Sequence, residues 1–315
     1  MSKKTAANLF MVLGTMIWGA AFVAQSIGAE HIGPYTMNAI RFFLGGLTVL
    51  PIILINRKKS AATPARTDAP VKRYLIAGAV CGLALFLGAL LQQIGITHTT
   101  VGNAGFLTAL YVVMVPIFSL VLFKKKIPKS VFIAIALAVA GTFLLCVTEA
   151  FTVNIGDVYS FAGAIFWAAQ ILCIEKLGRD LDGLKFSFYQ SMFCAALNAV
   201  FMFTIERPSL ESIGAALLPL LYAGILSVGV GFTAQVVCIK YTDPTVAALI
   251  MSLESVFSVF FGWLILHETL SVRQGFGCLL VFTAVVLAQV TPAQFKRLFR
   301  RNGIAAEPDA EKPEC

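Results

Sequence analysis

The sequence predicts an all-α membrane protein with ten transmembrane helices, arranged as two inverted five-helix repeats. Three observations support this fold: an apolar composition, a series of membrane-spanning apolar segments, and a similarity between the two halves of the chain. Hydrophobic residues make up 58% of the 315 residues and charged residues 13%, and the mean hydropathy is +0.86. Soluble domains are about 45–50% apolar and ~25% charged, so the composition excludes an ordinary water-soluble domain.

The apolar segments are each close to the ~20 residues that a helix needs to cross a bilayer. Their predicted ranges are 8–28, 35–55, 73–96, 100–123, 130–147, 157–176, 184–205, 212–239, 244–266 and 272–290. Turn-forming pairs such as Gly33-Pro34 and Asp243-Pro244 separate neighbouring segments. We interpret 56–72 as a loop and 291–315 as a cytoplasmic tail.

The basic residues predict the orientation of these spans. Clusters at 3–4, 57–59, 72–73, 124–129 and 296–301 all fall on one side of the membrane. Only Arg207 and Arg273 fall on the other side, and Arg41 lies within a span. Because short cytoplasmic loops are enriched in Lys and Arg, we expect a multi-pass protein with both termini in the cytoplasm. The net charge of +8 is spread over these loops rather than over a basic folded module, so we expect no nucleic-acid partner.

The two halves of the chain resemble each other, as repeat proteins do. Superposing 96–99 on 239–242 aligns the following helices without a gap. The aligned pairs include Gln92 with Gln235, Leu110 with Leu253, and Phe118 with Phe261. In the earlier part of each half, Trp18 aligns with Trp167 and Arg41 with Gln190; the spacing changes once, because the first half has the longer loop at 56–72. The first repeat covers 8–147 and the second 157–290. Each contains an odd number of spans, so the second enters the membrane upside down. Inverted repeats place a solute site between the halves at the membrane midplane and support alternating access.

Several stretches resemble the EamA family of the drug/metabolite transporter superfamily. They are Trp18-Gly19-Ala20-Ala21-Phe22, Arg41-Phe42, "TTVGNAGFLTALYVVMVPIFSL" and "YTDPTVAALIMSLESVFSVFFGWLILHETLS". The resemblance implies a bacterial inner-membrane transporter that exports a small metabolite, amino acid or drug-like solute, in some members by proton exchange. It also implies a central cavity lined by the third, fourth, eighth and ninth helices. The family often has Pro after the mid-helix Glu, whereas Ser255 follows Glu254 here. We therefore expect a straighter ninth helix, with Pro116 left in the fourth.

Glu254 lies near the centre of the ninth predicted span. An ionisable residue at that depth costs roughly 2.5–3.5 kcal/mol on insertion scales and is a functional hypothesis by default. Desolvation favours the protonated carboxyl, which makes Glu254 a candidate proton carrier. A hydrogen-bonded Glu that only joins two helices is an equally good interpretation.

Aromatic and polar side chains at mid-depth predict a solute cavity, because small-molecule pockets combine the two. The cavity candidates are Trp18, Tyr111, Trp167, Asn198 and Glu254. Tyr111 and Glu254 rank highest because the repeat aligns them with each other. Packing of the aromatic residues inside the bundle is the alternative.

Polar residues near the two ends of the bundle are candidates for gates or vestibules. They are Arg41, Gln92, Gln93 and Asn103 toward the outer side, and Gln190 and Gln235 toward the inner side. Hydrogen bonding between helices, worth about 0.6 kcal/mol per contact on average, is the interpretation that we favour for them over gating.

Other classes of protein fit the sequence less well. No HExxH or GxSxG motif is present, the histidines fall at span ends, and the cysteines lack metal-binding spacing. We therefore expect no catalytic residue, no metal and no cofactor, with a small-molecule solute and the lipid bilayer as partners. A passive channel or a lipid or solute scramblase built on the same bundle stays open. A phosphorylated solute calls for a cation inside the cavity, and Lys240 lies at a helix end. We thus expect a neutral, zwitterionic or amphipathic solute.

Overall fold

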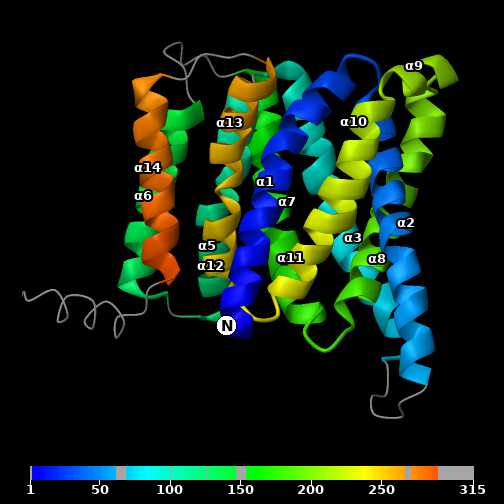
Figure 1. The fold of residues 1–315 in the computed structure, drawn as a ribbon, viewed down its shortest axis with the longest axis horizontal. Coiled ribbons are helices and arrows are strands. Elements are labelled where there is room, and N and C mark those ends of the chain that lie inside the picture. Colours follow the sequence, from blue (N-terminus) through cyan, green and yellow to red (C-terminus); the bar gives the residue numbers. More distant parts are fainter. Residues whose placement is uncertain are drawn as a thin grey trace, which may run out of the picture.

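The computed structural model describes residues 2–61, 69–99, 101–125, 127–146, 154–266 and 271–289. These residues form a bundle of long helices that run up and down along one common direction (Figure 1). The first half contains α1 (Lys3–Ala29), α2 (Pro34–Ala61), α3 (Val71–His98), α4 (Val101–Ala109), α5 (Tyr111–Phe123) and α6 (Lys129–Cys146). The second contains α7 (Ile155–Leu177), α8 (Gly183–Phe201), η1 (Met202–Glu206), α9 (Leu210–Ala215), α10 (Leu217–Leu221), η2 (Tyr222–Phe232), α11 (Thr233–Cys238), α12 (Pro244–Met251), α13 (Glu254–Leu266) and α14 (Val272–Gln289). The predicted tail at 291–315 lies outside the described residues.

The predicted spans are confirmed as helices. Within the described part of the chain, eight helical stretches are long and apolar enough to cross a membrane, and two shorter apolar helices accompany them at Lys129–Leu144 and Val272–Ala288. The shorter two are the fifth and tenth predicted spans, and they pack on each other as α6 and α14 at one edge of the bundle (Figure 1). Gly141 permits this contact, because a Cβ atom there would lie 2.8 Å from the carbonyl oxygen of Gly277. Small residues serve this purpose widely in membrane helices.

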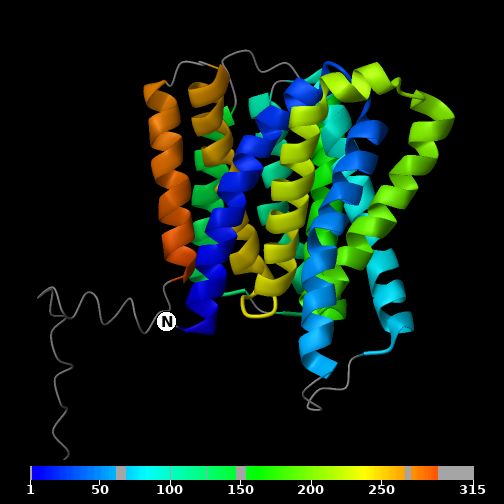
Figure 2. The ribbon, with the colours of Figure 1, turned by 45° about the vertical axis from the view of Figure 1, so that its right-hand side comes forward.

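The two halves interlock rather than stand apart. Helix α3 of the first half packs on α7 and α8 of the second, and α1 packs on α13 (Figures 1 and 2). Glycines on α3 make the approach possible: a Cβ atom on Gly95 would lie 2.1 Å from the Ser160 hydroxyl oxygen, and one on Gly88 would lie 3.3 Å from the Trp167 ring. The interior of the bundle is therefore an interface between the repeats.

The fourth and ninth spans are both interrupted near their middle. Leu110 separates α4 from α5, and Ser252 and Leu253 separate α12 from α13. At each interruption an amide reaches three residues back, from Leu110 to the Leu107 carbonyl at 3.3 Å and from Leu253 to the Ile250 carbonyl at 3.1 Å. Since the repeat aligns Leu110 with Leu253, the two interruptions are the same structural feature in the two halves.

The expectation of a straighter ninth helix is wrong, and serine hydroxyls provide the physical reason. Ser252, Ser255 and Ser258 each donate to the carbonyl three residues earlier, at 2.7, 2.7 and 2.9 Å. Serine side chains that bond back to the preceding turn compete with the helical ladder and bend it. The ninth span therefore breaks without a proline, whereas Pro116 follows the break in the fourth.

The eighth span contains a feature that the sequence did not predict, the π-helical segment η2. It packs closely on α2 through glycines, since a Cβ atom on Gly224 would lie 2.6 Å from Leu44 Cβ and one on Gly229 2.8 Å from Thr48 Cβ. Wide π-type turns occur often at functional sites. Here the segment brings Ser227 and Phe232 to the interior of the bundle.

Candidate functional site

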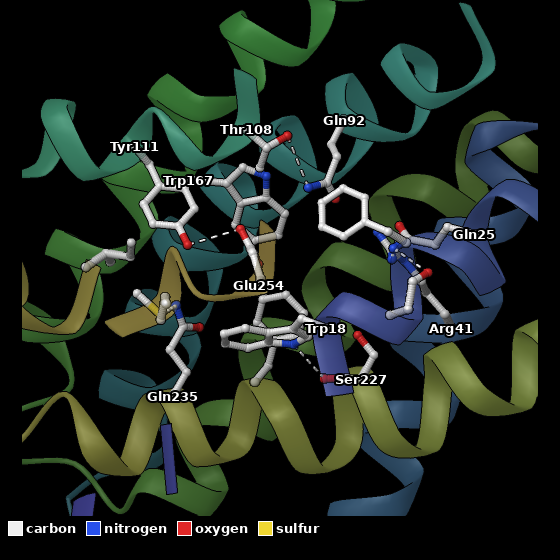
Figure 3. Close-up of a pocket in the computed structure, with 15 residues that line it drawn as sticks. Trp18, Gln25, Arg41, Gln92, Thr108, Tyr111, Trp167, Ser227, Gln235 and Glu254 are labelled. Carbon is white, nitrogen blue, oxygen red and sulfur yellow. Dashed lines mark hydrogen bonds between the residues drawn. The ribbon is translucent and has the colours of Figure 1, made fainter. Parts of the chain in front are cut away.

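A cavity of about 40 Å³ lies inside the bundle and is lined by residues of both halves (Figure 3). This volume is well below the roughly 300–1,000 Å³ range of small-molecule pockets, so the walls of the cavity lie close together in this structure. Arg41, Tyr111 and Glu254 are the ionisable side chains among the lining residues, and aromatic rings and amides make up much of the rest. The surface can thus contact both an apolar body and a polar group of a solute.

Tyr111 and Glu254 meet across the interface between the repeats. The Tyr111 hydroxyl donates to Glu254 Oε1 at 3.1 Å, and both side chains are buried (Figure 3). Tyr111 is the first residue of α5 and Glu254 the first of α13, so each directly follows the interruption in its span. Backbone N–H groups at a helix start favour a negative charge. The interruptions therefore place a carboxyl and its hydrogen-bond donor at two positions that the repeat aligns.

A second pair of contacts is repeated in the two halves. Gln92 Nε2 donates to the Thr108 hydroxyl oxygen at 3.4 Å, and Gln235 Nε2 donates to Met251 Sδ at 3.5 Å. The repeat aligns Gln92 with Gln235 and Thr108 with Met251. All four residues line the cavity, so the two repeats contribute aligned residues to its wall.

Aromatic rings form the apolar part of the wall. Trp18 and Trp167 both pack on Phe232, with ring centroids 5.3 and 5.6 Å apart. Trp18 Nε1 donates to the Ser227 carbonyl oxygen at 3.2 Å, while the buried Trp167 Nε1 has no hydrogen-bond partner. Trp18 and Trp167, which the repeat aligns, therefore both pack on the Phe232 ring.

Arg41 lines the same cavity although it is only 2% exposed. Its Nε donates to Asn38 Oδ1 at 2.9 Å, its Nη1 donates to Gln25 Oε1, and its guanidinium carbon lies 5.0 Å from the centre of the Phe42 ring. Its Nη2 has no hydrogen-bond partner. The argument that the cavity lacks a cation is therefore wrong. Arg41 reaches the cavity because Gln25 and Asn38 bind its guanidinium inside the bundle.

Comparison with known proteins identifies the family. The sequence profile of the EamA-like transporter family matches residues 5–147 and 154–289, one match for each repeat. This chain belongs to the EamA-like transporter family.

Relatives of this EamA protein are also named as transporters. An "Uncharacterized transporter" of Archaeoglobus fulgidus is 31% identical over 289 residues, which cover 91% of this chain and 87% of the relative. The "Uncharacterized transporter YoaV" of Bacillus subtilis is 27% identical and covers 88% and 94%. A solved crystal structure with 19% identity aligns over 95% of this chain and 99% of its own, with a TM-score of 0.74. The chain is thus a multi-pass membrane protein of a transporter family, and the fold is shared with a solved structure.

Three of the predicted residues, Asn198, Gln93 and Gln190, are not among the described residues that line the cavity. Asn198 donates to the Cys194 carbonyl oxygen at 2.9 Å within α8, and Gln93 donates to the Gln25 carbonyl oxygen at 3.3 Å. Gln190 accepts from Gln170 at 3.5 Å. The side chain of Asn103 lies outside the described part of the structure. Of the residues predicted for cavity and gates, the structure gathers Trp18, Tyr111, Trp167, Glu254, Arg41, Gln92 and Gln235 around one cavity.

Eight lining residues were not among the predicted cavity and gate residues: Ala21, Phe22, Gln25, Thr108, Ile171, Ser227, Phe232 and Met251. The repeat could have found Thr108, because it aligns with Met251 as Gln92 aligns with Gln235. Phe232 aligns with Ala89, so the alignment gave no aromatic pair to notice. Ser227 contributes through a backbone carbonyl in η2, which side-chain chemistry does not indicate.

Proposed function

We propose that this protein exports a small solute by alternating access, with the central cavity as the solute site and Glu254 as the proton carrier. The observation that supports this proposal most is the Tyr111–Glu254 hydrogen bond, which joins the interruptions of two repeat-related spans. Inverted repeats in transporters carry their site at such an interface and move against each other around it. We also infer a bacterial inner-membrane location with both termini in the cytoplasm, from the bias in Lys and Arg.

The proton acts on the contact between α5 and α13. An ionised Glu254 accepts a charge-assisted hydrogen bond from Tyr111, which is stronger than a bond between neutral groups. Protonation removes this charge and weakens the contact, so the two interrupted helices separate more easily. Arg41 also lines the cavity. The proton thereby biases a two-state arrangement of the helices, as a ligand does when it binds one state better.

Transport by purified protein in liposomes tests this proposal. Labelled amino acids and the hydrophobic cation tetraphenylphosphonium serve as probes, with and without an imposed pH gradient. We expect saturable exchange, and acceleration of net uptake by the gradient. Flux that rises linearly with solute concentration would instead favour a channel or a scramblase.

Glu254→Gln separates proton coupling from solute binding. The amide keeps the size of the side chain but carries no titratable proton. We expect the acceleration by the pH gradient to disappear while solute exchange at equal pH persists. Glu211→Gln, on an exposed residue of α9, is the matched control and should leave both rates unchanged. An undiminished response of Glu254→Gln to the gradient would refute the role of Glu254.

A further inference from the structure

Arg41 carries a buried positive charge that nothing among the described residues neutralises. Its two hydrogen-bond partners, Asn38 Oδ1 and Gln25 Oε1, are neutral amide oxygens. None of the described carboxylates forms an ion pair with it, and Glu254 on the same cavity wall binds Tyr111 instead. Ionisable residues inside membrane spans are costly and are normally paired, so the structure leaves room for an anionic partner.

The unsatisfied donor lies on the wall of the cavity. Arg41 is 2% exposed and lines the cavity, and its Nη2 has no acceptor among the described residues. A buried polar group without a partner costs about 1–3 kcal/mol, and more when it is charged. A guanidinium has a planar set of donors that suits carboxylate and phosphate oxygens. The partner that the chemistry calls for is therefore an oxyanion in the cavity.

The second repeat offers an internal control for a purely structural role. Gln190 aligns with Arg41 and is fully buried, yet it is neutral and is not among the described residues that line the cavity. Its Oε1 accepts from Gln170, and its Nε2 has no partner among the described residues. An amide is therefore sufficient to fill this position of the repeat. The charge is present only in the half where the side chain reaches the cavity, which indicates a task other than packing.

Aromatic rings lie next to the guanidinium. Phe42, whose ring lies 5.0 Å from the Arg41 guanidinium carbon, packs on Phe232 at 5.9 Å, and Phe232 packs on both Trp18 and Trp167. Figure 3 shows Arg41 beside Gln25 at one side of the cavity and Trp18 and Trp167 nearer its middle. We propose that the transported solute carries an anionic group that binds Arg41 and an apolar or aromatic body that contacts Trp18 and Trp167. That the solute is transported rests on the proposed function; the inference adds the chemical class of that solute.

Calorimetric titration of the full-length protein in nanodiscs tests the inference with three probes that share one body. They are 3-phenylpropionate, 2-phenylethyl phosphate and the neutral 3-phenylpropionamide. We expect at least one anion to bind about 10- to 100-fold more tightly than the amide, as a hydrogen bond to a charged group allows. The carboxylate and phosphate arms distinguish the two kinds of anion. A wild-type protein that binds neither anion, or binds the amide equally well, would overturn the inference.

Arg41→Gln copies the residue of the other repeat and removes the charge. We expect it to lower the affinity for the preferred anion to that for the amide, while the amide affinity stays within about twofold of wild type. Arg41→Lys, which keeps the charge but loses the planar fork, should fall between them. Arg73→Gln, at an exposed ion pair with Asp180, is the control and should change neither affinity. An Arg41→Gln protein that keeps the preference for the anion would contradict the inference; if it does not fold, Arg41→Lys and the wild-type comparison decide.

The same variants separate this inference from the proposed function. Anion-selective binding without exchange in liposomes would refute the carrier and leave the Arg41 site intact. Saturable exchange that prefers a cation and is unchanged in Arg41→Gln would refute the site and leave the carrier intact.

Discussion

The two repeats agree in their backbone and differ in the chemistry that they bring to the cavity. Both have an interrupted span, a glutamine that contacts the residue two positions before the aligned leucine of the interruption, and a tryptophan that packs on Phe232. At aligned positions, however, Tyr111 faces Glu254, Arg41 corresponds to Gln190, and Ala89 corresponds to Phe232. The shared features are those that the inverted architecture needs. The differences concentrate where a solute and a proton would bind, so they separate scaffold from function.

The contact between Tyr111 and Glu254 gives the largest expected effect. Tyr111→Glu places two carboxyls at the contact, and Glu254→Tyr removes the carboxyl that lines the cavity among the described residues. Each single variant should lower proton-driven uptake at least tenfold in liposomes, because it deletes the donor or the acceptor. The double variant exchanges the two residues between aligned positions and restores the pair.

We expect the double variant to fold as stably as wild type and to recover part of the uptake. Its control is Tyr111→Phe, which removes the hydroxyl alone and should leave folding intact. A double variant that is no better than the singles would show that the two positions are not equivalent, despite the symmetry of their helices.

The spans and the repeat could be predicted because hydropathy and self-similarity are properties of the sequence itself. The interruption of the ninth span could not be predicted from proline, but its cause was visible: Ser252, Ser255 and Ser258 lie three residues apart on one face. In a membrane, where water cannot compensate, a serine hydroxyl that bonds the carbonyl three residues earlier competes with the helical amides for acceptors.

The site was predicted in part, and what was missed depends on contacts between helices. Arg41 was predicted as a gate or vestibule residue toward the outer side. It also lines the cavity, where Gln25, from another helix, accepts from its Nη1. Phe232 and Ser227 were missed because their placement depends on the π-helical turns of η2. Contacts between distant helices, which a single sequence does not reveal, decided both cases.

A substitution at Gly19 tests whether the first repeat tolerates the residue that the second repeat has at the aligned position. The repeat aligns it with Ala168, so Gly19→Ala makes the first half resemble the second. A Cβ atom on Gly19 would lie 2.4 Å from Phe257 Cβ and 2.8 Å from the Ser258 nitrogen. We therefore expect α1 and α13 to be pushed apart, with a loss of about 1–3 kcal/mol of stability, as overpacking costs. The measurement is thermal unfolding of the purified protein.

Gly14→Ala is the matched control on the same helix, since a Cβ atom on Gly14 would have nothing within 4 Å. It should be neutral or should stabilise by about 0.5–1 kcal/mol. Equal behaviour of the two glycine variants would contradict the close packing of α1 on α13.

The smallest expected effect concerns the starts of α2 and α8, which the two halves cap differently. Asp182 caps α8 from its own N-cap position, donated to by Leu184 and Lys185 amides at 3.0 Å. The aligned residue is Gly33, and the α2 amides of Tyr35 and Thr36 donate instead to Glu206, at 2.8 and 2.7 Å. One cap is thus local and the other joins α2 to η1.

Removing either cap should cost about 0.5–2 kcal/mol of stability. We expect Glu206→Ala to lose more than Asp182→Ala, because it also releases η1 from α2. Gly33→Asp alone should destabilise, since a Cβ atom on Gly33 would lie 2.4 Å from Glu206 Cδ. In the Glu206→Ala background that space is empty, so Gly33→Asp should recover a local cap of the kind found on α8. Gly33→Asp could instead destabilise the wild-type and Glu206→Ala proteins equally. Gly33 would then be required by the backbone of the turn, and not by the space that the Glu206 carboxylate occupies.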